Sequence, residues 1–224
     1  MKDNKMKKIA LFHTSAATLG MMQTLIADHM PQAEVMHIIE DSMIKQVMKH
    51  GGVSPEISAR IAGYINNAEK AGCEIFMTAC SSIGGAVEQC QFMTPLQLTR
   101  IDSAMVDEAI TLGGRISVLA TVATTLEPTL EFVRRKATEA GKKLDIVPML
   151  MPEAFIALLD GDNVTHDRIV AAGLQKALAS SDVVMLAQAS MARVLTTLPT
   201  PPSIPVLTSP ERGILWLKQL AQAV

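Results

Sequence analysis

The chain has 224 residues, enough for one large domain or two small ones that each bury a hydrophobic core. Its net charge of −2 and its few aromatic residues (five Phe, one Tyr, one Trp) give neither the basic surface nor the stacking platform of a nucleic-acid-binding protein. The apolar run behind the basic N-terminus, Ile9 to Phe12, is too short for a signal sequence or a membrane span. We therefore expect a cytoplasmic protein with no nucleic-acid or membrane partner.

The sequence also lacks the common cofactor motifs. Its three cysteines are odd in number and have no paired spacing, which favours reduced thiols over a disulfide framework. No CxxC or HExxH motif indicates a metal site, and no glycine-rich phosphate loop indicates nucleotide binding. We expect neither a metal ion nor another cofactor.

In chain order, short apolar runs alternate with longer helical patterns, which is typical of parallel sheets flanked by helices. The predicted strands are residues 8–13, 34–39, 74–79 and 97–101 in the first half, and 115–120, 144–149, 183–188 and 204–207 in the second. Helices are predicted near residues 18–29, 41–49, 55–71, 84–90, 103–112, 125–140, 152–159, 164–180 and 190–196. A last helix is predicted after Thr208, because Ser209, Pro210 and Glu211 form a helix-start pattern.

The two halves of the chain are similar in sequence. Residues 9–19 match residues 116–126 at an offset of 107, and residues 76–82 match residues 184–190 at an offset of 108. A repeat of this kind indicates two similar lobes with a site between them.

The repeat predicts a domain division. We expect a first lobe of residues 1–107 plus 209–224 and a second lobe of residues 108–208, with the second copy beginning near Gly113 and Gly114. The repeat also pairs Cys80 of the first lobe with Gln188 of the second.

Cys80 is the main candidate for chemistry. It follows a predicted strand and precedes a turn of small residues that opens a helix, and ligands of open α/β sheets bind at the carboxyl ends of the strands. A thiol at a helix N-terminus forms the reactive thiolate more readily, because the amide dipoles favour negative charge. The same turn offers Ser81 and Ser82 for binding a substrate carboxylate. The alternative is a buried structural cysteine, which is the interpretation we give to Cys73 and Cys90.

Hydroxyl groups also follow the first predicted strand of each half. Thr14 and Ser15 in the first half, and Thr121 and Thr124 in the second, are predicted to bind a small anion with their hydroxyls and free amides. The alternative for each is a helix cap or a turn.

Histidine and acidic residues give weaker signals. His13 is a further acid/base candidate because it ends a strand, whereas His29, His37, His50 and His166 have no evident partner and are interpreted as surface or packing residues. Asp102 is predicted to orient a loop or to pair with Arg100.

Together these residues resemble the aspartate/glutamate racemase superfamily, which includes hydantoin racemase, maleate isomerase and arylmalonate decarboxylase. Residues 78–82 are similar to its first cysteine motif, residues 118–121 to its threonine-bearing strand, and residues 186–190 stand where its second cysteine motif normally lies. The resemblance covers essentially the whole chain. It implies an α/β fold with two pseudo-symmetric lobes, each a four-stranded mostly parallel sheet flanked by helices, and the active site between the lobes. It also implies that no cofactor is needed and that the protein is a homodimer or a higher homo-oligomer.

In the racemases of this superfamily, one cysteine removes a proton from the substrate and a second cysteine returns it on the other face. Cys80 matches the first, but Gln188 replaces the second, and an amide does not move protons near neutral pH. The resemblance therefore implies an isomerase- or racemase-type enzyme that acts on a small carboxylate through one thiol. Gln188 and Ser190 would then hold a carboxylate or an anionic intermediate.

Two alternatives remain open from the sequence. One is a decarboxylase or another lyase of the arylmalonate decarboxylase type. The other is a non-catalytic protein that binds a small acid. The replacement of the second thiol by Gln188 is the observation that favours it. Labelling of Cys80 by a mild electrophile, blocked by small dicarboxylates, would favour an enzyme.

Overall fold

The computed structural model describes residues 6–198 and 200–223, and its internal contacts divide the chain into two compact units. Unit 1 contains the residues up to Ser103 and those from Pro210 onward, and unit 2 extends from Ala104 to Ser209. The predicted boundary between residues 107 and 108 falls inside the helix Ser103–Leu112 (α5). This helix packs as a whole on the second sheet, which is why it cannot be divided there.

Unit 1 contains a four-stranded parallel sheet with the order β2-β1-β3-β4. Its strands are β1 (Ile9–His13), β2 (Val35–Ile39), β3 (Ile75–Thr78) and β4 (Gln97–Arg100). Its helices are α1 (Leu19–His29), α2 (Asp41–His50), α3 (Pro55–Lys70), α4 (Gly84–Gln89) and α10 (Ser209–Gln222), with short 3-10 turns η1 (Ala16–Thr18), η2 (Ser81–Ile83) and η3 (Cys90–Met93).

The alternation of side chains along β1 and β3 sends neighbouring residues to opposite faces of this sheet. Phe12 and Phe76 face α2, α3 and α4, where they pack with Ile61. Leu11 lies on the other face, where it packs in one cluster with Leu217 of α10 and with residues of α1. Each face of the sheet is thus covered by helices, as expected for parallel strands.

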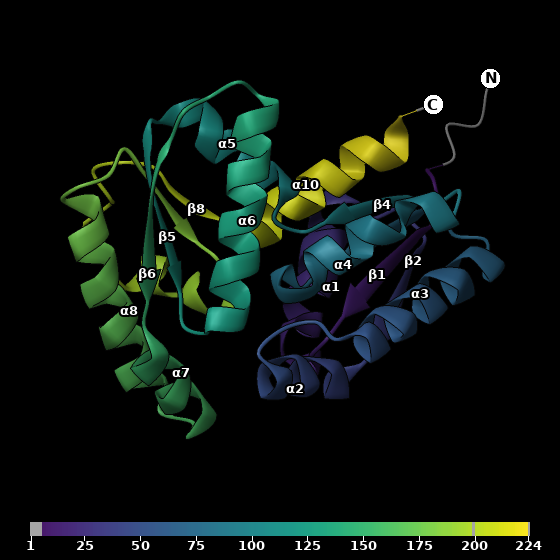
Figure 1. Ribbon diagram of the computed structural model, residues 1–224, viewed down its shortest axis with the longest axis horizontal. Helices are drawn as coiled ribbons and strands as arrows, with labels where there is room; N and C mark the ends of the chain where they lie inside the picture. Colours follow the sequence, from purple (N-terminus) through teal and green to yellow (C-terminus); the bar gives the residue numbers. More distant parts are fainter. Residues whose placement is uncertain (1–5, 199, 224) are drawn as a thin grey trace. The chain divides into compact units, whose positions relative to one another are not determined.

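Unit 2 repeats this architecture with the strand order β6-β5-β7-β8, again all parallel. Its strands are β5 (Arg115–Ala120), β6 (Asp145–Leu150), β7 (Val183–Leu186) and β8 (Val206–Thr208). Its helices are α5, α6 (Ala123–Glu139), α7 (Pro152–Leu159), α8 (Asn163–Leu178) and α9 (Val194–Thr197), with one 3-10 turn, η4 (Ala189–Met191). α5 and α6 cover one face and α7 and α8 the other, and Figure 1 shows α6 and α8 on opposite sides of the strands.

The two sheets have the same register. Phe12 of β1 is paired with Thr78 of β3, and Leu119 of β5 is paired with Leu186 of β7, which are the positions that the sequence repeat aligns. Both sheets also have the same next hydrogen bond after this pair. Ala79 N donates to Phe12 O over 2.8 Å in unit 1, and Ala187 N donates to Leu119 O over 2.9 Å in unit 2. Cys80 and Gln188 therefore follow their strands at equivalent positions.

The predicted fold class is confirmed, with wholly parallel sheets instead of mostly parallel ones. The predicted helix near residues 190–196 is divided into η4 and the shorter α9. Among the described residues, every helix is too short or too polar to cross a lipid bilayer.

Candidate active site

Cys80 lies two residues beyond the carboxyl end of β3, in an extended conformation (φ −125°, ψ 113°), and η2 begins at the next residue. The Thr78 side chain fixes this backbone: its Oγ1 accepts from Cys80 N over 3.2 Å and donates to Cys80 O over 3.3 Å. Cys80 is partly exposed, whereas Cys73 and Cys90 are buried. Burial raises the pKa of Cys73 and Cys90, which fits a structural role for both.

The hydroxyl groups predicted beside Cys80 differ in accessibility. Thr14, Ser81 and Ser82 are buried at the ends of β1 and β3. Ser15 is partly exposed and caps η1, since its Oγ accepts from Ala17 N over 3.2 Å. Side chains alternate along a strand, so Thr14 lies on the same face of the sheet as Phe12. Cys80 lies on this face as well, because it packs against the cluster under α3 and α4 that contains Phe12.

His13 is not on this face. The alternation of β1 sends it to the face covered by α1 and α10, where its Nε2 is 3.0 Å from Nδ1 of His37. Burial, together with the nearby His37, lowers the pKa of His13 to about 4, and burial also lowers the pKa of His37. His37 therefore has a partner that the sequence did not reveal, and an acid/base role for His13 stays a prediction.

In unit 2, Gln188 takes the place of the thiol beyond the carboxyl end of β7. Its backbone is extended like that of Cys80 (φ −129°, ψ 139°), and η4 follows. Its Oε1 accepts hydrogen bonds from the backbone N–H of Thr121 and, over 3.0 Å, from Thr121 Oγ1. Thr121 is fully buried, so its amide and hydroxyl are not free for an anion as predicted.

This bond decides which end of the Gln188 amide is presented. A backbone N–H can only donate, so the oxygen of Gln188 must face Thr121 and the NH2 group must point away. Gln188 is partly exposed, and its Nε2 has no hydrogen-bond partner among the described residues. The residue thus offers two donors and no free acceptor.

Thr124 and Ser190 lie shortly after the carboxyl ends of β5 and β7, respectively. Thr124 is the second residue of α6, and its Oγ1 is a buried atom without a partner in the described part of the chain. It does not cap α6, whose N-cap residue is Val122 without a side-chain bond. Ser190 is partly exposed in η4. Hydroxyls and amides at the start of a helix suit an anion.

An ion pair fixes the turn after Gln188. Arg193 Nε donates to Asp167 Oδ1 over 2.8 Å and to Oδ2 over 3.0 Å, which ties the residue before α9 to α8. Nδ1 of the fully buried His166 is 2.7 Å from Asp167 Oδ1. Burial opposes ionisation of Asp167, but the hydrogen bonds from His166 and Arg193 lower its pKa. His166 therefore has two partners that the sequence did not reveal: Asp167, its neighbour in the chain, and Arg193, which is 27 residues away.

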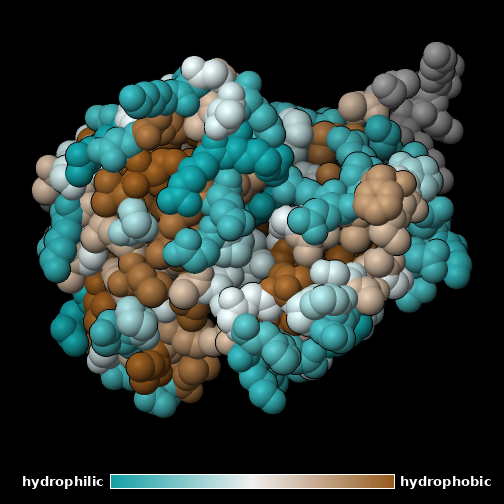
Figure 2. Space-filling view, in the orientation of Figure 1, coloured by the Kyte–Doolittle hydropathy of each residue, from teal (hydrophilic) through white to brown (hydrophobic). Residues whose placement is uncertain are grey.

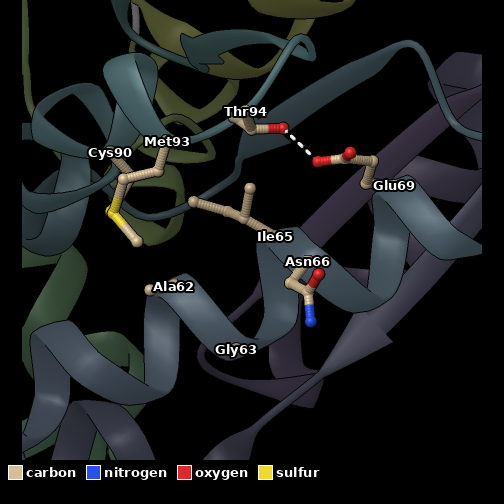
Figure 3. A pocket seen from close by; sticks show the side chains of 8 residues that line it. All are labelled: Ala62, Gly63, Ile65, Asn66, Glu69, Cys90, Met93 and Thr94. Carbon is tan, nitrogen blue, oxygen red and sulfur yellow. Dashed lines mark hydrogen bonds between the residues drawn. The ribbon is translucent and has the colours of Figure 1, made fainter.

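A pocket of about 320 Å³ lies elsewhere in unit 1, between α3 and η3 (Figure 3). Its lining residues are Ala62, Gly63, Ile65, Asn66, Glu69, Cys90, Met93 and Thr94. Thr94 Oγ1 donates to Glu69 Oε2 over 2.7 Å at its rim, shortly before β4 begins. The pocket is therefore near the amino ends of the strands and includes no predicted site residue. The described residues also contain no group of three or more His, Cys, Asp or Glu side chains that could hold a metal ion.

The fold and the strand-end residues define a class of α/β proteins in which two parallel sheets of equal register each carry polar groups at their carboxyl ends. The model of the Asp/Glu/Hydantoin racemase family matches residues 11–214, and the chain belongs to this family of racemase-type enzymes.

Solved structures share the fold at low sequence identity. The chain is similar to a glutamate racemase isoform from Bacillus anthracis (14% identity, TM-score 0.72, 97% of this chain and 82% of that chain). It is also similar to an aspartate racemase homologue from Pyrococcus horikoshii OT3 (17% identity, TM-score 0.70, 97% and 100%). A third is an allantoin racemase from Klebsiella pneumoniae (17% identity, TM-score 0.63, 96% and 87%). A search of curated protein sequences finds no match.

Proposed function

We propose that the protein is a cofactor-independent enzyme of the isomerase/racemase type, which moves a proton next to the carboxylate of a small acid with Cys80 as its single catalytic thiol. The observation that carries this proposal is the fixed orientation of Gln188, whose oxygen is held by Thr121. At the position equivalent to Cys80, the second unit thus presents donors for an anion, and it presents no group that can take up a proton.

The proposed reaction needs no external oxidant or co-reactant. The Cys80 thiolate removes a proton from the α-carbon, and the electron pair of the broken C–H bond passes into an enediolate. The thiol then returns the proton to the same carbon or to a conjugated one. The donors proposed to stabilise the enediolate oxygens are Gln188 Nε2, Thr124 Oγ1 and the Ser190 hydroxyl.

The remaining predicted residues are proposed to bind the substrate carboxylate or to shape its surroundings. Thr14 and Ser15 follow β1, the strand next to the thiol-bearing β3, and Ser81 and Ser82 follow Cys80 in η2. Thr121 acts through Gln188. Because Thr14 and the two serines of η2 are buried, we expect them to act on a substrate that is largely enclosed.

The setting of the protein is also a proposal. A catalytic thiol must stay reduced, which suits the cytoplasm, and the three cysteines are free. Figure 2 shows hydrophobic surface over α7, where Ile156 is 59% and Leu159 70% exposed, next to Val164 of α8 at 80%. Patches of this kind mark protein contacts, which supports a homodimer or a higher homo-oligomer.

Solvent-deuterium exchange tests the proposed function. Amino acids, hydroxy acids, malonates and unsaturated diacids are incubated with the enzyme in D2O, and exchange, racemisation, isomerisation and CO2 release are followed. We expect α-hydrogen exchange of at least one acid to outpace its racemisation, because one thiol works on one face of the carbon. Cys80→Ala should reduce exchange by about 100-fold or more. The matched control is Cys90→Ala, which removes a buried thiol that donates to Ala86 O and should leave exchange near the wild-type rate.

Other outcomes would contradict the proposal. Exchange that survives Cys80→Ala would exclude the thiol as the proton carrier. Release of CO2 from malonates without exchange of any other acid would indicate a decarboxylase, and binding without turnover would indicate a carrier.

A further inference from the structure

Arg100, the last residue of β4, is a buried cation in a closely defined setting. The side chain is 2% exposed, and its partner Asp102 is fully buried. Arg100 Nε donates to Asp102 Oδ1 and Nη2 donates to Oδ2, both over 2.8 Å, which is the bidentate geometry of an arginine–carboxylate pair. Nη1 lies 3.5 Å from Glu88 Oε2 on α4. Burying a charge is costly, so its retention here requires a reason beyond packing.

Arg100 has a contact at each end of the turn that carries Cys80. At the start of the turn, β4 pairs Arg100 with Thr78, and Ile101 N donates to Thr78 O over 2.9 Å. Thr78 in turn holds the backbone of Cys80 through its hydroxyl.

At the end of the turn, the Arg100 side chain lies against Gly84, the first residue of α4. A β-carbon at Gly84 would lie 2.5 Å from Cζ of Arg100 and nearer still to Nε, so only glycine fits. Arg100 thus pairs by its backbone with the strand that leads into the Cys80 turn and contacts the end of this turn by its side chain.

Unit 2 provides an internal comparison. By the register of the two sheets, Thr208 of β8 stands where Arg100 stands in β4. Ala192, the residue after η4, stands where Gly84 follows η2. Where the arginine is present the helix starts with glycine, and where it is absent the equivalent residue has a side chain. The arginine–glycine contact therefore occurs in the unit that has the thiol and is missing from the unit that has the amide.

We infer that Arg100 and Asp102 are positioning residues for Cys80: they hold the turn in the conformation in which the thiol reacts. This inference rests on the proposed function of Cys80 and adds residues that do not touch the substrate. Asp102 fixes the guanidinium, the guanidinium fixes Gly84, and Gly84 fixes the far end of the turn.

The test compares Gly84→Ala with Gly85→Ala in the full-length protein. A β-carbon at Gly85 meets nothing within 4 Å, so the second variant makes the same change one residue further along α4 without touching Arg100. The rate of Cys80 alkylation by iodoacetamide is measured from pH 6 to pH 10 by peptide mass spectrometry, with no substrate present, and the unfolding free energy is measured in urea.

We expect Gly84→Ala to slow Cys80 alkylation about tenfold at pH 7, because the displaced turn no longer holds the thiol in its reactive conformation. Gly85→Ala should match the wild type. A Gly84→Ala protein that is less stable but has an unchanged Cys80 rate and pH profile would overturn the inference, since Arg100 would then be merely structural.

A second variant keeps the test decisive if Gly84→Ala does not fold. Arg100→Lys retains the charge beside Asp102 but cannot form the bidentate contact. It should slow alkylation of Cys80 as Gly84→Ala does, and a wild-type profile in this variant would equally overturn the inference. Because alkylation needs no substrate, this result is independent of whether the exchange assay supports the proposed reaction.

Discussion

Gln188 has one defined orientation because Thr121 donates to its oxygen from both the backbone and the side chain. Two substitutions separate what this side chain does for the fold from what it does for a substrate. Gln188→Glu keeps an oxygen for Thr121 and replaces the NH2 donors by a second, negatively charged oxygen. Gln188→Cys removes the amide and introduces a second thiol.

We expect both Gln188 variants to lose exchange activity, by about 100-fold or more, because each removes the donor to the enediolate. The measurement is the solvent-exchange rate of the best substrate, with urea unfolding as the control for stability. Wild-type exchange in Gln188→Glu would show that the donor is unimportant. Unchanged exchange together with new racemisation in Gln188→Cys would show that Gln188 has no role of its own.

His13 gives the stability of the protein a pH dependence. Its pKa is lowered to about 4 by burial and by His37, from an ordinary value near 6.5. A histidine with a lowered pKa favours the folded state in its neutral form. Its contribution is therefore complete above pH 6.5 and is lost as the pH falls from 6.5 towards 4.

We expect the unfolding free energy of the wild type to fall by up to about 3 kcal/mol between pH 6.5 and pH 4 because of His13. His13→Asn should flatten this part of the profile, whereas His50→Gln, which changes an exposed histidine at the end of α2, should leave it as in the wild type. Urea unfolding at a series of pH values measures the effect. An equally steep profile in His13→Asn would place the titrating group elsewhere.

The candidate residues that follow strands were visible in the sequence, but most of their partners were not. Cys80 and Gln188 are found by the repeat, and Arg100 is close enough to Asp102 for the pair to be anticipated. The bond from Thr121 to Gln188 spans 67 residues, and the one between His13 and His37 depends on strand pairing. Contacts of this kind follow from sheet order and side-chain direction, which a single sequence does not define.

At the scale of elements, one carboxylate joins three segments of unit 1. Glu40, between β2 and α2, accepts from Tyr64 Oη of α3 over 2.6 Å and from Ser42 Oγ over 2.7 Å, and it pairs with Arg60 over 2.6 Å. The hydrogen bond from Tyr64 is the main reason that the pKa of Glu40 is lowered to about 2. The ionised form stabilises the fold, so this contribution is present above pH 4.5 and is lost as the pH falls through about 2.

Tyr64→Phe tests this junction by removing one hydroxyl. We expect a loss of about 1.5–3 kcal/mol at pH 7, the usual range for a hydrogen bond to a charged group, and a loss that decreases towards pH 2. The matched control is the same change in a Glu40→Gln background, where it should cost less. Equal costs in the two backgrounds would show that Tyr64 and Glu40 are not coupled.

The strands and long helices were predictable because each has its own hydrophobic period and a clear start or stop signal. Ser54 with Pro55 begins α3, and Gly51 in the left-handed conformation ends α2. The division at α5 was not predictable, because it depends on which sheet covers Met105 and Val106. The predicted helix 190–196 is shorter because its start is η4, where Met191 N and Ala192 N bond to Gln188 and Ala189.

At the scale of the whole molecule, α10 belongs to unit 1 although unit 2 precedes it in the chain. Leu217 is fully buried in the cluster with Leu11, whereas Leu215 of the same helix is 39% exposed. Leu217→Ala should cost about 2–5 kcal/mol of stability in unit 1 and Leu215→Ala much less. Hydrogen exchange locates the effect: protection should fall in β1 and β3 and remain in β5 and β7. Loss of protection throughout both sheets would show that the units unfold together.

The position of α10 in unit 1 also matches that of α5 in unit 2. α10 and α1 cover one face of the first sheet, as α5 and α6 cover the corresponding face of the second, so α10 is the counterpart of α5. Lys7 N donates to Ala221 O over 3.0 Å, which places the residue just before β1 beside the last turn of α10 in unit 1.

With α10 counted ahead of β1, each unit contains one helix followed by four parallel strands and their connecting helices, so the two units share one helix-first module. The first module is thus discontinuous in the chain, because its helix follows the last strand of the second.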